Sequence, residues 1–367
     1  MKKILLDIGH PGHVHYFRNA IRMLEQRGHQ VTVVARDKEV TFSLLKSYGI
    51  PYTSRGTGSK GLLSKLLYTL KGDYHLLQVA RTFRPDLFLS FGSPYAAQVS
   101  WLMGKPHIAF DDTEHARLGQ LMYRPFTRTV VTPQAYRQEV GPRQVRFDSF
   151  IELCHLAPAY FQPDPGVLTD LGLTPADPFI LLRFVSWDAN HDVGHQGLTF
   201  TQKLQLVDQL KAYGRIFISS EGKLPAELEL YRLRLAPEKL HHLLAYASLY
   251  IGEGSTTASE CALLGVPNIL VNSLLAPATR PGVHTELERY GVQALFVSFE
   301  GVLEKAVALL REDARTEWQE RRRRLLDEKI DVTAFMVWLV ENYPASLHVI
   351  NENPSYQYRF KMVLEQV

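Results

Sequence analysis

Residues Leu240–Val271 read LHHLLAYASLYIGEGSTTASECALLGVPNILV. This pattern predicts a helix, a short apolar strand, a turn of small residues, a second helix and another apolar strand. The turn from Gly252 to Thr257 leaves room for a ligand to approach the backbone where the second helix begins. Free amide groups and the helix dipole favour a phosphate at that point. A carboxylate such as Glu260 repels phosphate, so its natural partner is a neutral diol such as a ribose. We therefore expect a site for a nucleoside diphosphate.

The rest of the chain alternates apolar runs with amphipathic helical patterns. We expect strands at Lys3–Ile8, Gln30–Ala35, Asp86–Ser90, His107–Phe110, Thr129–Thr132, Phe179–Phe184, Arg215–Ser219, Leu249–Ile251, Asn268–Val271 and Ala294–Val297. Strands that alternate with helices of ten residues or more call for parallel βαβ units. The expected fold class is therefore α/β, with two doubly wound, Rossmann-like domains facing a cleft.

Length and composition agree with two soluble domains. A chain of 367 residues is too long for one ordinary core. The segment APAYFQPDPG at Ala157–Gly166 contains three prolines, so we expect a linker between domains at 1–160 and 167–345. The net charge of +3 makes no case for a nucleic-acid partner, and acidic residues flank the run Arg321–Arg324.

The sequence also suggests the compartment. The apolar run after MKK is too short for a signal peptide, and we find no segment that would span a bilayer. Two cysteines, Cys154 and Cys261, form no disulfide framework and have no metal-ligand spacing. We expect a cytoplasmic protein, with a peripheral contact to the inner face of the membrane left open. Its oligomeric state cannot be read from the sequence.

The first predicted strand leads into DIGHPGHVHYFRNA, in which His13 follows Gly12 at the start of a predicted helix. A histidine at this position suits a general base near neutral pH. His10 and His15 share the turn, and the alternative is that these histidines only cap the helix or bind phosphate. We prefer His13 as the base and expect no metal site.

A group of acidic residues follows the predicted strand at His107–Phe110. The segment FDDTEHARLG places Asp111, Asp112, Glu114 and His115 within five positions. Capping of a helix would explain one acid but not three. We consider two roles for them: holding sugar hydroxyls or acting as acid and base.

Two strands of the second domain end in polar residues. Arg183 lies at the end of one strand and has the geometry to bind a diphosphate through its fork of donors. Ser219 ends the next strand and would line the same site. His191, Asp192 and His195 belong to the long polar loop after Arg183, where they would either reach the site or lie in solvent.

With these residues in place, the chain resembles the GT-B superfamily of nucleotide-sugar enzymes. The run PEKLHHLLAYASLYIGEGSTTASECALLGVP is similar to its donor-binding segment. The GHPGHV turn is similar to the GGTGGHV loop of the peptidoglycan N-acetylglucosaminyltransferase, with His13 on that loop's histidine. The DDTEHA segment resembles a prokaryotic family of uncharacterised proteins placed near the hydrolysing UDP-GlcNAc 2-epimerases. By this resemblance, residues 346–367 would cross back onto the first domain.

The resemblance implies an inverting, metal-independent glycosyltransferase that uses a UDP-sugar in the synthesis of cell-surface polysaccharide or glycolipid. His13 would take a proton from a sugar or lipid-linked acceptor, which Asp111, Asp112 or Glu114 would position. The donor would be a substrate, with no further cofactor. The residues expected to contact it are Gly12, Arg183, Ser219, Gly254, Ser255, Thr256, Thr257 and Glu260.

Two other functions stay open on the same fold. One is a UDP-GlcNAc 2-epimerase or a hydrolase, with the acids and a histidine moving protons at the sugar. The epimerases carry a His-Arg-Arg-Glu-Asn sequence where this chain has FVSWDANHD, which disfavours this alternative. The other is a non-catalytic partner in polysaccharide assembly that keeps a nucleotide pocket.

Overall fold

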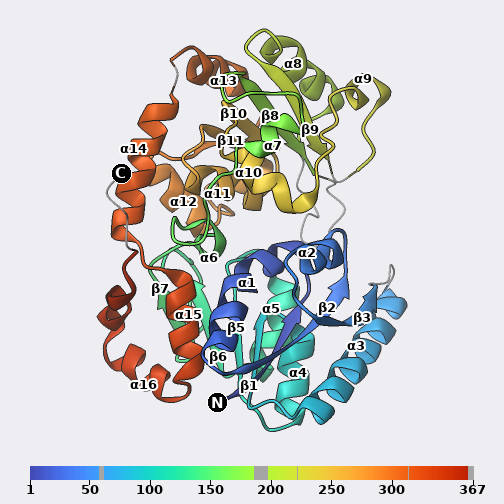
Figure 1. Cartoon of the computed structure of the whole chain (residues 1–367), viewed down its shortest axis with the longest axis vertical. Helices are drawn as coiled ribbons and strands as arrows, with labels where there is room; N and C mark the ends of the chain where they lie inside the picture. Colours follow the sequence, from blue (N-terminus) through green and yellow to red (C-terminus); the bar gives the residue numbers. More distant parts are fainter. Residues whose placement is uncertain (58–61, 186–196, 221, 313, 363–367) are drawn as a thin grey trace. The chain divides into compact units, whose positions relative to one another are not determined.

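The computed structural model describes residues 1–57, 62–185, 197–220, 222–312 and 314–362, with the backbone alone for 62–70. The chain divides into two compact units. The first unit contains Met1–Tyr160 and resumes at Lys329, and the second contains the described residues of Phe161–Glu328. The first boundary lies inside the proline-rich segment APAYFQPDPG. Figure 1 shows the elements of both units in sequence colours.

The first unit is built on a parallel sheet with the strand order β3-β2-β1-β4-β5-β6-β7. Its strands are β1 (Lys3–Ile8), β2 (Gln30–Asp37), β3 (Tyr52–Thr57), β4 (Leu87–Phe91), β5 (His107–Phe110), β6 (Thr129–Pro133) and β7 (Gln144–Phe147). Its helices are α1 (Pro11–Gln26), α2 (Thr41–Ser47), α3 (Leu62–Phe83), α4 (Pro94–Leu102), α5 (Arg117–Tyr123), α6 (Leu153–Leu156), α15 (Val332–Glu341) and α16 (Ala345–Glu352), with 3₁₀ turns η1 (Arg124–Phe126) and η4 (Pro354–Phe360).

The second unit has a parallel sheet of order β12-β11-β10-β8-β9. Its strands are β8 (Phe179–Phe184), β9 (Arg215–Ser220), β10 (Leu249–Gly252), β11 (Asn268–Val271) and β12 (Ala294–Phe296). Its helices are α7 (Gly166–Thr169), α8 (Phe200–Leu210), α9 (Ala226–Glu229), α10 (Leu240–Leu244), α11 (Ser255–Leu263), α12 (Gly282–Arg289), α13 (Val302–Arg311) and α14 (Arg315–Glu328), with 3₁₀ turns η2 (Pro237–Lys239) and η3 (Ser273–Leu275).

These two sheets confirm the expected pair of doubly wound α/β units. In each sheet the strand order reverses beside the first strand, between β1 and β4 in the first unit and between β8 and β10 in the second. Ligands of such folds bind outside the carboxyl ends of the strands at this reversal. The loops after β1 and β10 both begin there.

Helices cover both faces of the first sheet, and the strands direct alternate side chains into the cores on the two faces. Ile4 and Leu6 of β1 pack in one cluster with residues of α1 and α15, whereas Leu5 packs in another with residues of α3 and α4. Neither face is left to water, which is why the strands read as continuous apolar runs.

The return to the first unit begins earlier than the sequence suggested. We expected residues 167–345 to form the second domain and the crossing to begin at residue 346, but the first unit resumes at Lys329. The reason is the apolar face of α15, where Phe335 and Met336 are fully buried in the core shared with α1. Figure 1 shows α15 alongside α1.

Two strands escaped the sequence analysis, β3 and β7. Both are edge strands of the first sheet. β3 has only one buried residue, Arg55, and β7 buries Val145 and Phe147 in a run of four. Neither sequence therefore shows the continuous apolar run that marks the interior strands of this sheet.

Among the described residues, the structure has no helix that combines the length and the apolar character needed to cross a membrane. The segment 62–70 forms the first part of α3, and its side chains lie outside the described part of the structure.

Candidate functional site

At the reversal in the second sheet, three residues of neighbouring strands lie side by side near the carboxyl ends of those strands. Arg183 of β8 pairs in register with Gly252 of β10 on one side and with Ser219 of β9 on the other. The Nη1 of Arg183 donates to Ser219 Oγ at 2.8 Å. Register and hydrogen bond together hold the guanidinium at the carboxyl end of the sheet, beside the turn into α11.

The helix α11 begins without a side-chain cap. Gly254 is its N-cap, in extended conformation, and no side chain accepts a hydrogen bond from the first turn. The first turn also contains no acidic residue. Ser255 is half-buried, Thr256 is exposed and Thr257 is buried. The amide groups of this turn are therefore suited to an anion, because neither a carboxylate nor a capping oxygen competes for them.

Glu260 lies on the second turn of α11 and is paired within the same unit. Its Oε1 lies 2.9 Å from Nε2 of His241, which α10 supplies. A carboxylate held by a histidine is fixed in orientation, which suits a group that must accept hydrogen bonds from a ligand's hydroxyls.

Glu253 is a residue that the sequence analysis did not single out. Its buried carboxylate accepts from the backbone N–H of Val185 at 3.0 Å and of Leu198 at 2.5 Å. Lys203 of α8 lies 3.7 Å from the same carboxylate. Glu253 thus ties the turn before α11 to Val185, directly after β8, and to Leu198, just before α8. The signal in the sequence was an acid set between two glycines directly after an apolar strand.

His191, Asp192 and His195, which the sequence offered as further site residues, lie outside the described residues. Nothing in the structure bears on their predicted role.

In the first unit, the loop after β1 is organised around Asp7. This fully buried carboxylate accepts from Arg55 Nε at 2.8 Å and from the hydroxyl of Ser93. Arg55 lies over the ring of Tyr95, with its Cζ 4.1 Å from the ring centroid. The buried pair fixes β3 and the start of α4 to the end of β1, and so shapes the loop that carries the histidines.

His10 and His13 have different roles in that loop. His10 is the N-cap of α1, and its Nδ1 accepts from the backbone N–H of Gly12 at 3.2 Å. The Nδ1 of His13 accepts from the backbone N–H of Gly9 at 3.4 Å. A neutral imidazole that accepts at Nδ1 carries its hydrogen on Nε2. His13 in this geometry presents a donor at Nε2, and acting as a base there requires the other tautomer.

Burial lowers the pKa of His13 well below its usual range, and the charges of His10, Lys38 and Arg55 lower it further. The ring is therefore neutral at pH 7, which is the correct state for a base. Its role as a base stays a prediction.

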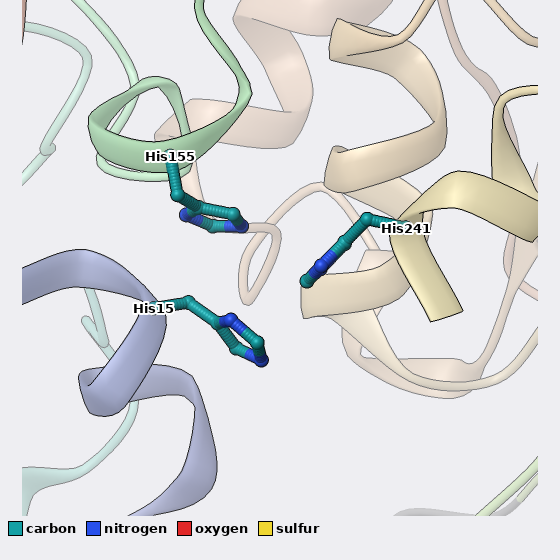
Figure 2. A group of neighbouring side chains, drawn as sticks. All are labelled: His15, His155 and His241. Carbon is teal, nitrogen blue, oxygen red and sulfur yellow. The ribbon is translucent and has the colours of Figure 1, made fainter. Parts of the chain in front are cut away.

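His15 lies one turn along α1 and contacts a residue that the sequence analysis did not pair with it. Figure 2 shows its ring beside that of His155 from α6; the centroids are 5.2 Å apart and the planes are inclined by 29°. Its Nδ1 also lies 3.3 Å from the hydroxyl of Tyr48. The third side chain in the figure, His241, belongs to the second unit and is the partner of Glu260 described above.

Asp111, directly after β5, is enclosed by donors. Its Oδ2 accepts from the hydroxyl of Tyr123 at 2.5 Å and from that of Tyr136 at 3.4 Å, and Arg124 lies 3.6 Å away. Its Oδ1 accepts from the backbone N–H of Thr113 at 2.9 Å. With both oxygens engaged inside the unit, Asp111 is well placed to hold the loop.

Asp112 and Glu114 differ in how firmly they are held. Glu114 Oε1 accepts from the backbone N–H of Arg137 at 3.0 Å. Asp112 is half-buried, and its Oδ1 accepts from the hydroxyl of Thr113 at 2.9 Å. Burial raises the pKa of Asp112 to about 7, helped by the charges of Asp111 and Glu114. Burial raises the pKa of Asp111 as well, so both neighbouring carboxyl groups hold a proton more readily than free ones, and Asp112 is the more exposed of the two.

Comparison with solved structures gives the same fold. A UDP-GlcNAc 2-epimerase of Methanocaldococcus jannaschii, solved with UDP-GlcNAc and UDP, aligns with a TM-score of 0.61 and 12% identity, over 84% of this chain and 92% of that one. MurG of Acinetobacter baumannii aligns with a TM-score of 0.56 and 17% identity, over 93% of this chain and 99% of that one. The two units therefore have the fold of the GT-B glycosyltransferases and the UDP-GlcNAc 2-epimerases.

Sequence comparison gives a relative and a family. The uncharacterized protein MJ0665 of Methanocaldococcus jannaschii is 24% identical over 283 residues, which cover 72% of this chain and 80% of that protein. Residues 2–275 match the model of the family described as "Protein of unknown function (DUF354)". The match covers most of the chain, and the chain belongs to this family.

Proposed function

We propose that this protein is a glycosyltransferase of GT-B type that uses a nucleotide-diphosphate sugar, with a UDP-sugar as the preferred donor. The observation that carries the proposal is the uncapped start of α11 at Gly254, set beside the guanidinium of Arg183. A helix start and a fork of donors at one sheet edge suit a diphosphate. One fold neighbour, the UDP-GlcNAc 2-epimerase of Methanocaldococcus jannaschii, was solved with UDP-GlcNAc and UDP, which supports the same class of ligand.

The diphosphate would bind to the backbone amides of Ser255–Thr257 and to Arg183, which Ser219 orients. When the sugar leaves, negative charge builds up on the diphosphate, and donors already in place stabilise that charge without rearranging. Such an arrangement needs no metal ion. The metal-independent mechanism and the inverting outcome are parts of this proposal.

The ribose would bind to Glu260. Its hydroxyls donate to a carboxylate, and His241 keeps that carboxylate turned in one direction through the 2.9 Å contact. Loss of the histidine should then weaken nucleoside binding without touching the diphosphate contacts.

The first unit would supply the acceptor side. His13 would take the proton of the acceptor hydroxyl after its ring gives up the contact with Gly9. Asp112 would accept a hydrogen bond from the acceptor, and Asp111 would hold the loop that carries it. The acceptor would be a sugar or a lipid-linked sugar in the synthesis of polysaccharide or glycolipid. It would bind on the cytoplasmic side.

A second candidate is an epimerase or hydrolase that acts on the same donor. One observation favours it: the carboxyl group of Asp112 has a pKa of about 7 and lies beside two other acids. Such a group moves protons readily near neutral pH, as removal and return of a proton at a sugar carbon requires.

Two experiments test these proposals. Titration calorimetry with UDP and UDP-GlcNAc should show binding that falls by about 10- to 100-fold in Arg183→Gln, because one charge-assisted contact is worth about 1.5–3 kcal/mol. Arg183→Lys keeps the charge but loses the fork, so an intermediate loss is expected. Arg311→Gln, an exposed charge on α13, serves as the control.

Glu260→Gln should weaken UDP binding but leave pyrophosphate binding unchanged. If Glu260→Gln and Arg183→Gln bind UDP as tightly as the wild type, the donor site is elsewhere. Incubation with UDP-GlcNAc alone, followed by NMR, separates the two reactions. An epimer or free sugar at a catalytic rate supports the second candidate, and product only with an added acceptor supports the first.

A further inference from the structure

A cavity of about 410 Å³ lies at the amino ends of β5, β6 and β7, within the first unit. It is lined by Trp101, Gly104, Lys105, Pro125, Phe126, Thr127, Arg128, Arg143 and Tyr343. All seven strands of the sheet are parallel, so this edge is opposite to the one that carries His13 and Asp112. The cavity is therefore separate from the acceptor side proposed above.

Three of the lining residues are cations, and no lining residue is acidic. The Nη1 of Arg143 donates to the carbonyl oxygens of Arg124 at 3.4 Å and Thr127 at 3.2 Å, which fixes its guanidinium at the cavity. Within the described ranges, Lys105, Arg128 and Arg143 form no ion pair. Three positive charges gathered around one hollow, with no acid beside them, favour an anion there.

The other wall of the cavity is aromatic. Trp101 and Phe126 meet edge to face, with ring centroids 5.6 Å apart. Trp101 nevertheless leaves 64% of its surface exposed, and its neighbour Leu102 leaves 62% exposed. A large apolar surface held open to solvent beside a cluster of cations is typical of a surface that binds a ligand with both an apolar and a charged part.

We propose that this cavity binds the phosphate group of an organic phosphate. Lys105, Arg128 and Arg143 contact the phosphate, and Trp101 and Phe126 contact the apolar or ring-shaped portion. The guanidinium groups suit phosphate because their donors form a planar fork. The volume lies within the usual range for small-molecule sites, about 300–1,000 Å³. This chemistry has two sources, a soluble phosphorylated compound and the headgroup of an anionic phospholipid. The inference does not depend on the proposed transferase activity.

The test uses the full chain and two probes. Phenyl phosphate, followed by calorimetry, represents the soluble source. Vesicles of phosphatidylglycerol, compared with vesicles of phosphatidylcholine in a flotation assay, represent the lipid source. The variant Lys105→Gln/Arg128→Gln removes two charges at the cavity, and the exposed Arg311→Gln on α13 of the second unit is the control for charge alone.

We expect the double variant to lose at least about tenfold in affinity for one of the two probes, since the loss of a single charge-assisted contact already weakens binding by about tenfold or more. Arg311→Gln should bind as the wild type does. Trp101→Ala should weaken binding of the same probe. Because the side chain of Trp101 is mostly exposed, the variant should fold, which circular dichroism checks. Binding of phenyl phosphate alone identifies a soluble ligand, and binding of anionic vesicles alone identifies a lipid.

The proposal is overturned if neither probe binds, or if the double variant binds both probes as tightly as the wild type. It is also overturned if Arg311→Gln loses as much affinity as the double variant. UDP binding by the second unit is expected to be the same in all these variants. Failure of the phosphate-site proposal would therefore not count against the proposed donor site.

Discussion

The carboxyl group of Asp112 gives the sharpest test of the acidic cluster after β5. Its pKa is raised from 3.8 to about 7 by burial and by the charges of Asp111 and Glu114. The folded protein therefore keeps a proton on this group that the unfolded chain releases. This difference stabilises the folded state fully below about pH 4, and the stabilisation is lost as the pH rises to about 7. Asp112→Asn, which has no charge at any pH, should remove the effect.

The magnitude follows from the two pKa values. From pH 5 to about pH 7, the folded wild type holds this proton whereas the unfolded chain has released it. The free energy of unfolding therefore falls by about 1.4 kcal/mol per pH unit, or by about 3 kcal/mol over the two units. Asp112 is half-buried, and screening by water reduces this to about 1.5 kcal/mol. For a unit of this size, about 1 kcal/mol corresponds to about 2–4 °C in melting temperature.

Scanning calorimetry of the first unit's transition at pH 5 and pH 8 provides the measurement. The melting temperature of Asp112→Asn, relative to the wild type, should rise by about 3–6 °C between the two pH values. Asp208→Asn removes an acid on α8 of the second unit, whose side chain is 66% exposed, and it should leave the transition of the first unit as in the wild type. A constant difference for Asp112→Asn would refute the argument, because the carboxyl of the folded protein would then not change its protonation between pH 5 and pH 8.

Two further predictions concern stability. Tyr250 is fully buried in β10, and its hydroxyl has no hydrogen-bond partner among the described residues, so Tyr250→Phe should stabilise the second unit by about 1–3 kcal/mol. A lower midpoint in urea for this variant would show that the hydroxyl does have a partner. Asp331 caps α15 by accepting from the backbone N–H of Ala334 at 2.9 Å, and it accepts from the hydroxyl of Tyr160 at 2.5 Å. Asp331→Ala should therefore lower the stability of the first unit by about 1–3 kcal/mol, whereas Asp331→Asn should retain most of it; equal losses in both would contradict a capping role.

Much of the architecture was predictable from the sequence. The interior strands of both sheets read as apolar runs because helices cover both faces, and every strand of the second unit was expected where it occurs. The edge strands β3 and β7 were not predicted, because β3 buries only Arg55 and β7 is a run of four residues that buries two. The uncapped start of α11 was also visible, because the small residues from Gly254 to Thr257 and the lack of an acid in the first turn are local properties of the sequence.

Tertiary structure alone decided which side chains meet. The pairing of Arg183 with Ser219 depends on the register of β8 and β9, and the contact of Glu260 with His241 joins two helices. The sequence offered Asp111, Asp112 and Glu114 as equivalent acids. Only the fold distinguishes them, because the tyrosines that enclose Asp111 come from α5 and from the segment after β6.

The physical reason is the range of the interactions. Periodicity and turn chemistry report whether a residue is buried and how the backbone bends over a few positions, and the amino-acid order is enough for that. Proton affinity and hydrogen bonding depend on neighbours that are brought close by strand pairing and helix packing. The sequence by itself therefore determined the alternating α/β framework and the turn of small residues before α11, whereas the partners and protonation of the candidate site residues came from the folded structure.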